Sequence, residues 1–143
     1  MKAISLWQPY AVLCAVGAKR FETRGWETAY RGPLLIHASR KLDGSIKAMA
    51  ESELVVSILR QCYRPCYNDW IDLPFGAIVG RAHLVACSRM RDLPPPSERE
   101  RALGDWSPDR YAWELASPEL FGSPIPFRGM QRLFNVNDKV MAA

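Results

Sequence analysis

Residues 17–24 read Gly-Ala-Lys-Arg-Phe-Glu-Thr-Arg, and they follow an apolar run from Trp7 to Val16 that has the spacing of a helix. The glycine that opens the segment is a natural end for that helix. If the last four residues are extended, Glu22 and Arg24 lie on one face, because side chains alternate along a strand. Lys19 falls in the turn just before. The segment therefore predicts a helix end, a turn and a strand that bring two cations and one carboxylate together.

This group of charges suits an anionic or strongly hydrogen-bonding ligand. A carboxylate between two cations is kept ionised by its neighbours and orients them in return. The alternative is a salt-bridge cluster on a strand that enters solvent, with no ligand at all. The charges alone leave both interpretations open.

The rest of the chain has the pattern of many short strands with two main helices. Strands are expected at residues 2–6, 20–26, 34–38, 77–87, 111–116 and 133–136, and helices at 8–16 and 46–62. Prolines 118, 124 and 126 indicate a loop after the fifth of these strands. The pattern predicts an α+β fold with a small, partly closed barrel.

At 143 residues the whole chain, 1–143, is expected to be one domain. Residues 88–110 contain a run of three prolines and mixed charges, which indicates an exposed, insertion-like loop with a short helix from Glu98. The charge run at 97–101 is expected to be a solvated helix face.

The spacing Gly17-x-Lys19-x-x-Glu22-x-Arg24 resembles the signature of the ASCH domain family. Further segments resemble the family in the same order, namely Ser5 to Ala11, Tyr30 to Ala38, Pro74 to Gly80, and Tyr111-Ala112-Trp113. The similarity extends from residue 4 to about residue 136. The resemblance implies a PUA-like mixed β-barrel flanked by two main helices.

The resemblance also implies a basic cleft that binds RNA or a modified nucleotide. Aromatic side chains beside cations offer stacking surfaces and phosphate partners, which suits single-stranded nucleic acid. The candidate binding residues are Trp7, Gln8, Tyr10, Lys19, Glu22, Arg24, Arg31, Ser39, Arg40 and Trp113. The alternatives are core packing for the two tryptophans, helix capping for Gln8 and a solvated charge for each outer arginine. His37 is expected to be a packed or lining histidine rather than a catalyst.

Enzymatic alternatives use the same residues. Some bacterial members of the family have been associated with RNA cleavage, which needs an acid, a base and a phosphate clamp. Glu22, Lys19 and Arg24 would together fill these roles in a metal-independent ribonuclease. A carboxylate held ionised by two cations is, however, a poor acid and a weak base. Smaller relatives are amidohydrolases on an acetylated cytidine, but they carry a threonine where this chain has Glu22. A third class is a protein-interaction adaptor that uses residues 88–110.

The composition favours anionic partners only mildly, with a net charge of +4 and a sequence pI near 9.0. No apolar run approaches the ~20 residues of a membrane span, and no signal peptide is recognised, so a cytoplasmic protein is expected. Cys62 and Cys66 do not have the spacing of a common zinc site, while Cys14 and Cys87 read as core residues. No metal and no cofactor are expected, and the oligomeric state is left open.

Overall fold

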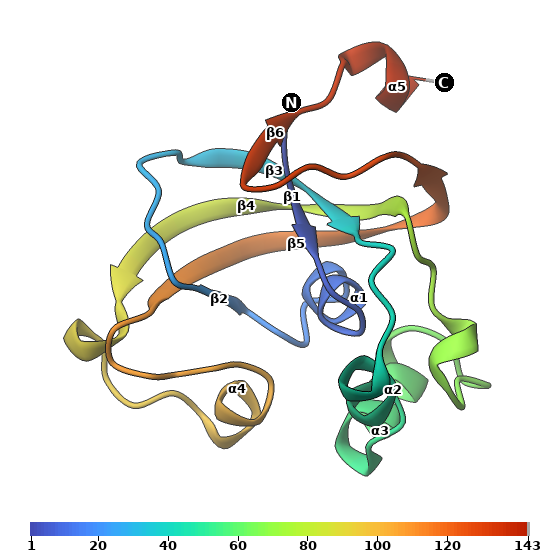
Figure 1. Ribbon diagram of the computed structural model, residues 1–143, viewed down its shortest axis with the longest axis horizontal. Coiled ribbons are helices and arrows are strands. Elements are labelled where there is room, and N and C mark those ends of the chain that lie inside the picture. The colour runs from blue at the N-terminus through green and yellow to red at the C-terminus, as the bar shows by residue number, and fades with distance from the viewer. Residues whose placement is uncertain (143) are drawn as a thin grey trace.

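The fold is built on one mixed sheet. The structure is a computed structural model, and it describes residues 1–142. Its strands are β1 (Lys2–Leu6), β2 (Phe21–Arg24), β3 (Gly32–Ala38), β4 (Ala77–Arg89), β5 (Tyr111–Pro126) and β6 (Leu133–Asn135). They follow the order β2-β5-β4-β3-β1-β6 across the sheet (Figure 1). Only β1 and β3 run parallel among these pairs of described strands.

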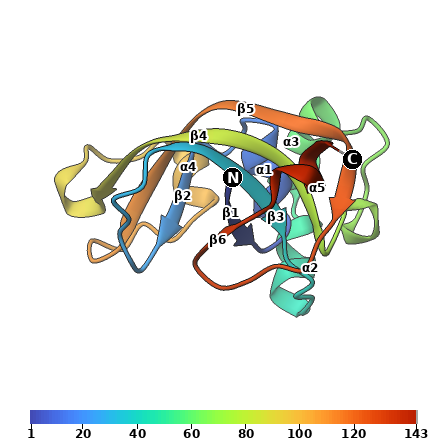
Figure 2. The same cartoon turned by 90° about the horizontal axis from the view of Figure 1, so that it is seen from above.

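The sheet is curled, and Figure 2 shows its two longest strands, β4 and β5, arching across its length. Register shifts in β4 accompany this curvature, the first of them between Ile78 and Gly80. A side chain at Gly80 would collide with the backbone of Glu119, which explains the glycine. The α+β class and the barrel-like sheet predicted from the sequence are both confirmed.

Helix α1 (Tyr10–Ala15) packs against β3, β4 and β5 and fills the centre of the curl (Figure 1). It ends at Ala15, and Gly17 follows with a φ of 82°, which residues with a side chain rarely adopt. The chain then folds back, so that the Lys19 N–H donates to the Leu13 carbonyl at 3.0 Å. The helix end therefore fixes the starting position of the charged motif.

The predicted helix over residues 46–62 is wrong as one element. The segment forms two helices, α2 (Gly44–Ala50) and α3 (Glu53–Cys62), each with its own cap. Asp43 accepts backbone hydrogen bonds at the start of α2, and the hydroxyl of Ser52 does the same at the start of α3. The second cap restarts the helix in a new direction, and α3 buries an apolar face against α1.

The predicted end of the fifth strand near residue 116 is also wrong, because β5 continues to residue 126. The partner β2 pairs only with Tyr111–Glu114, so the rest of β5 has β4 on one side and no strand on the other within the described sheet. Proline is tolerated on such an edge because the missing N–H faces away from the ladder. Pro118, Pro124 and Pro126 therefore lie inside the strand.

The segment between β4 and β5 contains a short 3-10 helix, Met90–Asp92, and helix α4 (Glu98–Ala102). The expected helix is present, but the prediction that its charge run is a solvated face is wrong at Glu100. This carboxylate is buried and accepts a hydrogen bond from the Arg20 backbone N–H at 2.6 Å. Leu103 follows in the core, so the segment folds back beside β2.

The N-terminus lies beside β6 (Figure 1). The terminal amine of Met1 donates to the Val136 carbonyl at 2.8 Å, and helix α5 (Asp138–Ala142) follows. Within residues 1–142, no helix combines the length and the apolar character needed to cross a bilayer.

Candidate functional site

The motif residues line a cavity of about 460 Å³ beside the end of α1, which we call the motif cavity. Glu22 and Arg24 project from β2 to the same side, with Glu22 Oε2 3.8 Å from Arg24 Nη2. Lys19 reaches the cavity from the turn after α1. The strand period thus correctly predicts that Glu22 and Arg24 lie on one side of β2. The other lining residues are Ser5, Trp7, Tyr10, Thr23, Met49, Ala102, Leu103, Gly104, Asp105 and Arg110.

Lys19 is nearly enclosed, with 1% of its surface exposed. Its Nζ donates to the Phe21 carbonyl and lies 5.8 Å from the centre of the Tyr10 ring. A buried ammonium is costly unless nearby groups compensate it, and it has more N–H donors than one carbonyl uses. Lys19 is therefore placed to bind an acceptor group inside the motif cavity.

Glu22 is held on both oxygens. Its Oε1 accepts from the Thr23 N–H at 2.8 Å, while Oε2 faces Arg24. Burial, and secondly the negative charge of Glu22, raise the pKa of Tyr10, so that this phenol stays protonated and can donate a hydrogen bond. Asp105 and Arg110 also line this cavity, with Asp105 Oδ2 3.6 Å from Arg110 Nε. The motif cavity thus combines donors, acceptors and apolar walls.

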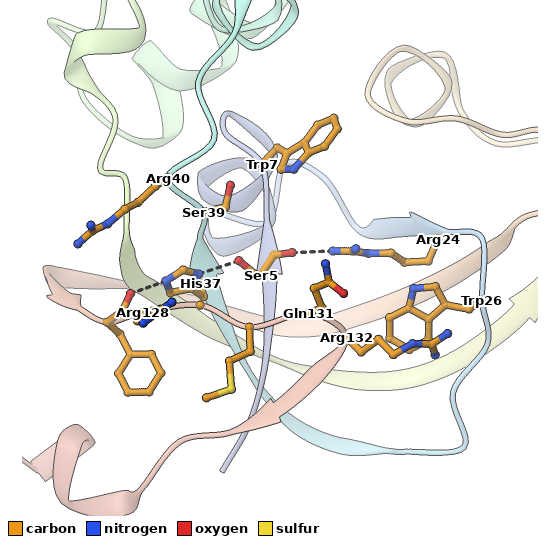
Figure 3. Close-up of a pocket in the computed structure, with 13 residues that line it drawn as sticks. Ser5, Trp7, Arg24, Trp26, His37, Ser39, Arg40, Arg128, Gln131 and Arg132 are labelled. Atoms are coloured by element: carbon orange, nitrogen blue, oxygen red, sulfur yellow. Dashed lines mark hydrogen bonds between the residues drawn. The ribbon is translucent and has the colours of Figure 1, made fainter.

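A second cavity of about 900 Å³ adjoins the first, and we call it the arginine cavity (Figure 3). It is lined by the four arginines Arg24, Arg40, Arg128 and Arg132, together with Ser5, Trp7, Trp26, His37, Ser39, Phe127, Gly129, Met130 and Gln131. Among the described residues, no carboxylate belongs to this lining. A cavity with cationic walls of this kind attracts anions.

The two cavities share Ser5, Trp7 and Arg24, so together they form one composite cleft. Arg24 Nη2 donates to the Ser5 carbonyl at 2.7 Å, which ties β2 to β1 across the cleft. The Nε atom of Arg24 is buried and has no hydrogen-bond partner among residues 1–142. Arg24 therefore stands where a ligand occupying both cavities would pass.

The back of the arginine cavity is formed by a hydrogen-bonded histidine. His37 Nδ1 lies 2.8 Å from Ser5 Oγ, and His37 Nε2 lies 2.7 Å from the Phe127 carbonyl oxygen (Figure 3). Burial lowers the pKa of His37, and the positive charge of Arg40 lowers it further, against the opposing effect of the Phe127 hydrogen bond. The imidazole is accordingly favoured in its neutral form.

Tryptophan side chains stand on two sides of the arginine cavity (Figure 3). Trp7 is 47% exposed, and Lys41 Nζ lies 3.9 Å from its ring centre. Trp26 has Arg132 at 4.8 Å over its ring and packs edge-on against the buried Trp113. Cation-covered aromatic faces at a cleft wall offer surfaces on which flat groups can stack.

The composite cleft gathers seven of the ten predicted binding residues: Trp7, Tyr10, Lys19, Glu22, Arg24, Ser39 and Arg40. The other three lie elsewhere. Gln8 is fully buried, where its Oε1 accepts from the Val12 N–H and its Nε2 donates to the Pro74 carbonyl, so it caps α1 instead of lining the cleft. Trp113 is fully buried in the core.

Arg31 is the third predicted residue outside the cleft. Its guanidinium is exposed and donates to the Thr28 and Tyr30 carbonyls of its own loop. This is the solvated charge that the sequence left open as the alternative. His83 is similarly remote, because it lies on the exposed face of β4.

The sequence did not single out several cleft residues. Arg128 and Arg132 belong to the segment between β5 and β6, which contains no recognised motif. The two arginines close to Gly129 were the only feature of this segment that could have indicated a binding role. Asp105 and Arg110 come from the segment after α4. Trp26 lay at the end of the predicted second strand without a role of its own.

The four cysteines are free thiols, with Cys14 in the core and Cys62 and Cys66 exposed. In the part of the chain that the structure describes, no cluster of histidine, cysteine and carboxylate side chains has the arrangement of a metal site. Cys87 is only partly buried and packs at the edge of the core, so its predicted core position holds in part.

Comparison with protein families gives one match along most of the chain, a model described as the ASCH domain over residues 4–124. Among curated proteins, the chain is similar to Activating signal cointegrator 1 of mouse (Mus musculus) and of human (Homo sapiens). Each is 26% identical over 137 residues, or 96% of this chain. The chain spans 22% of the length of these relatives.

Among solved structures, the fold is similar to ASCH from Zymomonas mobilis, with a TM-score of 0.56 and 16% identity. That match covers 99% of this chain and 90% of the other. A point mutant of the same bacterial protein aligns with a TM-score of 0.57, covering 99% of this chain and 93% of its own. At this identity the likeness supports the shared fold and carries no residue roles.

Proposed function

The chain belongs to the ASCH domain family, and on that premise we propose that it binds single-stranded RNA, or a nucleotide of the same chemistry, in the composite cleft. The observation that carries this proposal is the lining of the arginine cavity: four arginines and two tryptophans. Phosphates pair with arginine, and bases stack on aromatic rings.

The charge of the cleft favours a polyanion over a small neutral ligand. Arg24 and Arg40 come from β2 and the end of β3, whereas Arg128 and Arg132 come from the segment before β6. These guanidinium groups therefore surround the cavity from separate parts of the chain. A phosphodiester backbone offers repeated negative charges to such a surface, and each contact releases counterions.

The motif cavity suits a nucleobase better than a phosphate. Base edges carry both donors and acceptors, and the cavity offers both kinds of partner, since Lys19 and Tyr10 donate while carboxylates accept. Met49 and Leu103 supply apolar walls. We place the base in this compartment and the strand backbone along the arginine cavity.

Binding, rather than catalysis, is the activity that the motif supports best. Glu22 is occupied by the Thr23 N–H and by Arg24, which leaves it poorly placed to accept or deliver a proton. A labelled RNA incubated with the protein should therefore remain intact. If product forms and disappears with Glu22→Gln, the ribonuclease alternative is correct instead.

The direct test is fluorescence anisotropy with a labelled oligouridylate at several salt concentrations. Three phosphate contacts give a slope of roughly −2 in a plot of log affinity against log salt, from ~0.7 per contact on single strands. The double variant Arg128→Ala/Arg132→Ala should bind more weakly and flatten the slope. Arg81→Ala is the matched control, because Arg81 is exposed outside the cleft and paired with Glu119.

Flat salt dependence in the wild-type protein would place the ligand outside the arginine cavity. A loss of affinity in the Arg81→Ala control that is half the loss in the double variant, one charge against two, would mean that net charge alone drives binding. Either result removes the composite cleft as the binding site.

A further inference from the structure

Two groups, the His37 ring and the Phe127 carbonyl, fix the direction of the Ser5 hydroxyl. The Phe127 carbonyl can only accept a hydrogen bond, so His37 Nε2, at 2.7 Å, carries the proton. In a neutral imidazole the other nitrogen is then an acceptor. His37 Nδ1 is 2.8 Å from Ser5 Oγ, and the Ser5 hydroxyl therefore donates its proton to the ring.

The surroundings hold this arrangement in place. His37 is 1% exposed, and the rings of Phe127 and Phe134 pack edge-on around it. Gly129 closes the same spot, because a Cβ there would lie 2.5 Å from His37 Cε1 and 2.9 Å from Ser5 Oγ. The glycine lets the chain pass directly over the pair.

A serine hydroxyl usually rotates to donate or accept as its ligand requires. Ser5 has lost that freedom, since its single proton is used by His37. What remains available on Ser5 Oγ is lone-pair density, and Ser5 lines both parts of the composite cleft. The cleft therefore contains a fixed acceptor among its many cationic donors.

The ligand that fits a fixed acceptor here must offer a donor beside a phosphate. Arg24 Nη2 is held 2.7 Å from the Ser5 carbonyl, so a phosphate on Arg24 brings its neighbouring sugar to Ser5. The sugar–phosphate backbone of DNA offers only acceptors. RNA adds one donor, the ribose 2′-hydroxyl, which is the group that distinguishes the two polymers.

We propose that Ser5 Oγ accepts a hydrogen bond from a ribose 2′-hydroxyl, so that the composite cleft selects RNA over DNA. This rests on the proposed function, because it specifies the sugar of the strand bound there. His37 and Phe127 are positioning groups: they touch no ligand and act by orienting Ser5.

The test compares three oligonucleotides of one length and one base with the wild-type protein: oligouridylate, its 2′-deoxy form and its 2′-fluoro form. The 2′-fluoro sugar keeps the pucker of RNA but has no hydroxyl proton. We expect both modified strands to bind about 2- to 10-fold more weakly than RNA, the loss of one neutral hydrogen bond. Placing a single 2′-fluoro group at each position in turn should locate one sensitive nucleotide.

Ser5→Ala should bring all three strands to the same affinity, whereas Ser57→Ala should keep the preference. Ser57 is the matched control because it is an exposed serine on α3 that lines neither part of the composite cleft. If Ser5→Ala does not fold, the oligonucleotide comparison on the wild-type protein decides alone.

The outcomes separate this inference from the function on which it rests. Salt-dependent binding with equal affinity for the three strands overturns the role of Ser5 and leaves the proposed function standing. Equal affinity of RNA and the 2′-fluoro strand, with weak binding of the deoxy strand, assigns the preference to sugar pucker and also overturns it. Absence of saturable binding to every strand removes both.

Discussion

Lys41 Nζ lies 3.9 Å from the centre of the Trp7 ring, so a cation occupies one face of the most exposed aromatic side chain in the composite cleft. Such a contact is worth ~0.5–1 kcal/mol at an exposed site. Stacking of a base on an aromatic ring contributes ~1–3 kcal/mol. Under the proposed function we therefore expect a base to displace Lys41 from that face and the freed ammonium to pair with a phosphate.

Trp7→Ala tests this exchange. We expect RNA affinity to weaken by ~1–3 kcal/mol, the usual range for one stacked base. The urea midpoint should change little, because nearly half of the side chain is exposed. Trp7→Phe is the control and should restore part of the affinity. Unchanged RNA affinity in Trp7→Ala would show that the ring is not a stacking surface.

Trp113→Ala should have the opposite profile. The ring is fully buried, its Nε1 donates to the Trp26 carbonyl at 3.3 Å, and it packs against the Trp26 ring. Truncation should cost ~3–5 kcal/mol of the free energy of unfolding through lost burial and a cavity. Urea denaturation measures this, and a loss below 1 kcal/mol would contradict the core assignment.

These two tryptophans also show which features of the site can be predicted from the sequence and which cannot. Alternation correctly places Glu22 and Arg24 on one side of β2, because strand period is a local property. It cannot tell whether the face of β5 that carries Trp113 points to the cleft or to the core. That depends on the partner β2 and on the packing of Trp26, which are long-range contacts.

Contacts between segments that are distant in the sequence explain why the other cleft residues were not predicted. Arg128 and Arg132 reach the cleft only because the segment before β6 crosses β1 and β3 beside His37, and no local pattern encodes that approach. Gln8 was predicted to line the cleft from its place in the Ser5 to Ala11 segment, but its side chain is buried and donates to the distant Pro74 carbonyl. The fold class could be predicted from local periodicity, whereas the full set of cleft residues depends on how the strands assemble into the sheet.

The titration of His37 gives a test in pH. Its folded-state pKa is lowered, chiefly by burial, from the value of about 6.5 in an unfolded chain. Below about pH 6.5 the unfolded state binds the extra proton more readily, so this contribution to stability is complete above that pH and is lost as the pH falls towards the folded-state pKa. The Phe127 carbonyl accepts a hydrogen bond from the ring but carries no charge. The charged neighbour that acts on the pKa of His37 is Arg40.

We therefore expect the urea midpoint of the wild-type protein to fall between pH 7 and pH 5. His37→Gln should show a shallower fall. His83→Gln is the matched control, since His83 is the other of the two histidines and is exposed on β4. Identical pH profiles for the wild type and His37→Gln would remove His37 as the source.

Glu100 provides the last prediction, on the attachment of α4 to the motif strand. Its Oε1 accepts from the Arg20 N–H at 2.6 Å, one residue before β2 begins. Glu100→Ala leaves that partly buried N–H without its acceptor, which should cost ~1–3 kcal/mol of stability. Glu100→Gln keeps an acceptor oxygen and should cost less. Glu98→Ala, exposed on the same helix, is the control and should stay within about 0.5 kcal/mol of the wild type. Equal stability of Glu100→Ala and Glu98→Ala in urea would mean that α4 is held to β2 by apolar contacts alone.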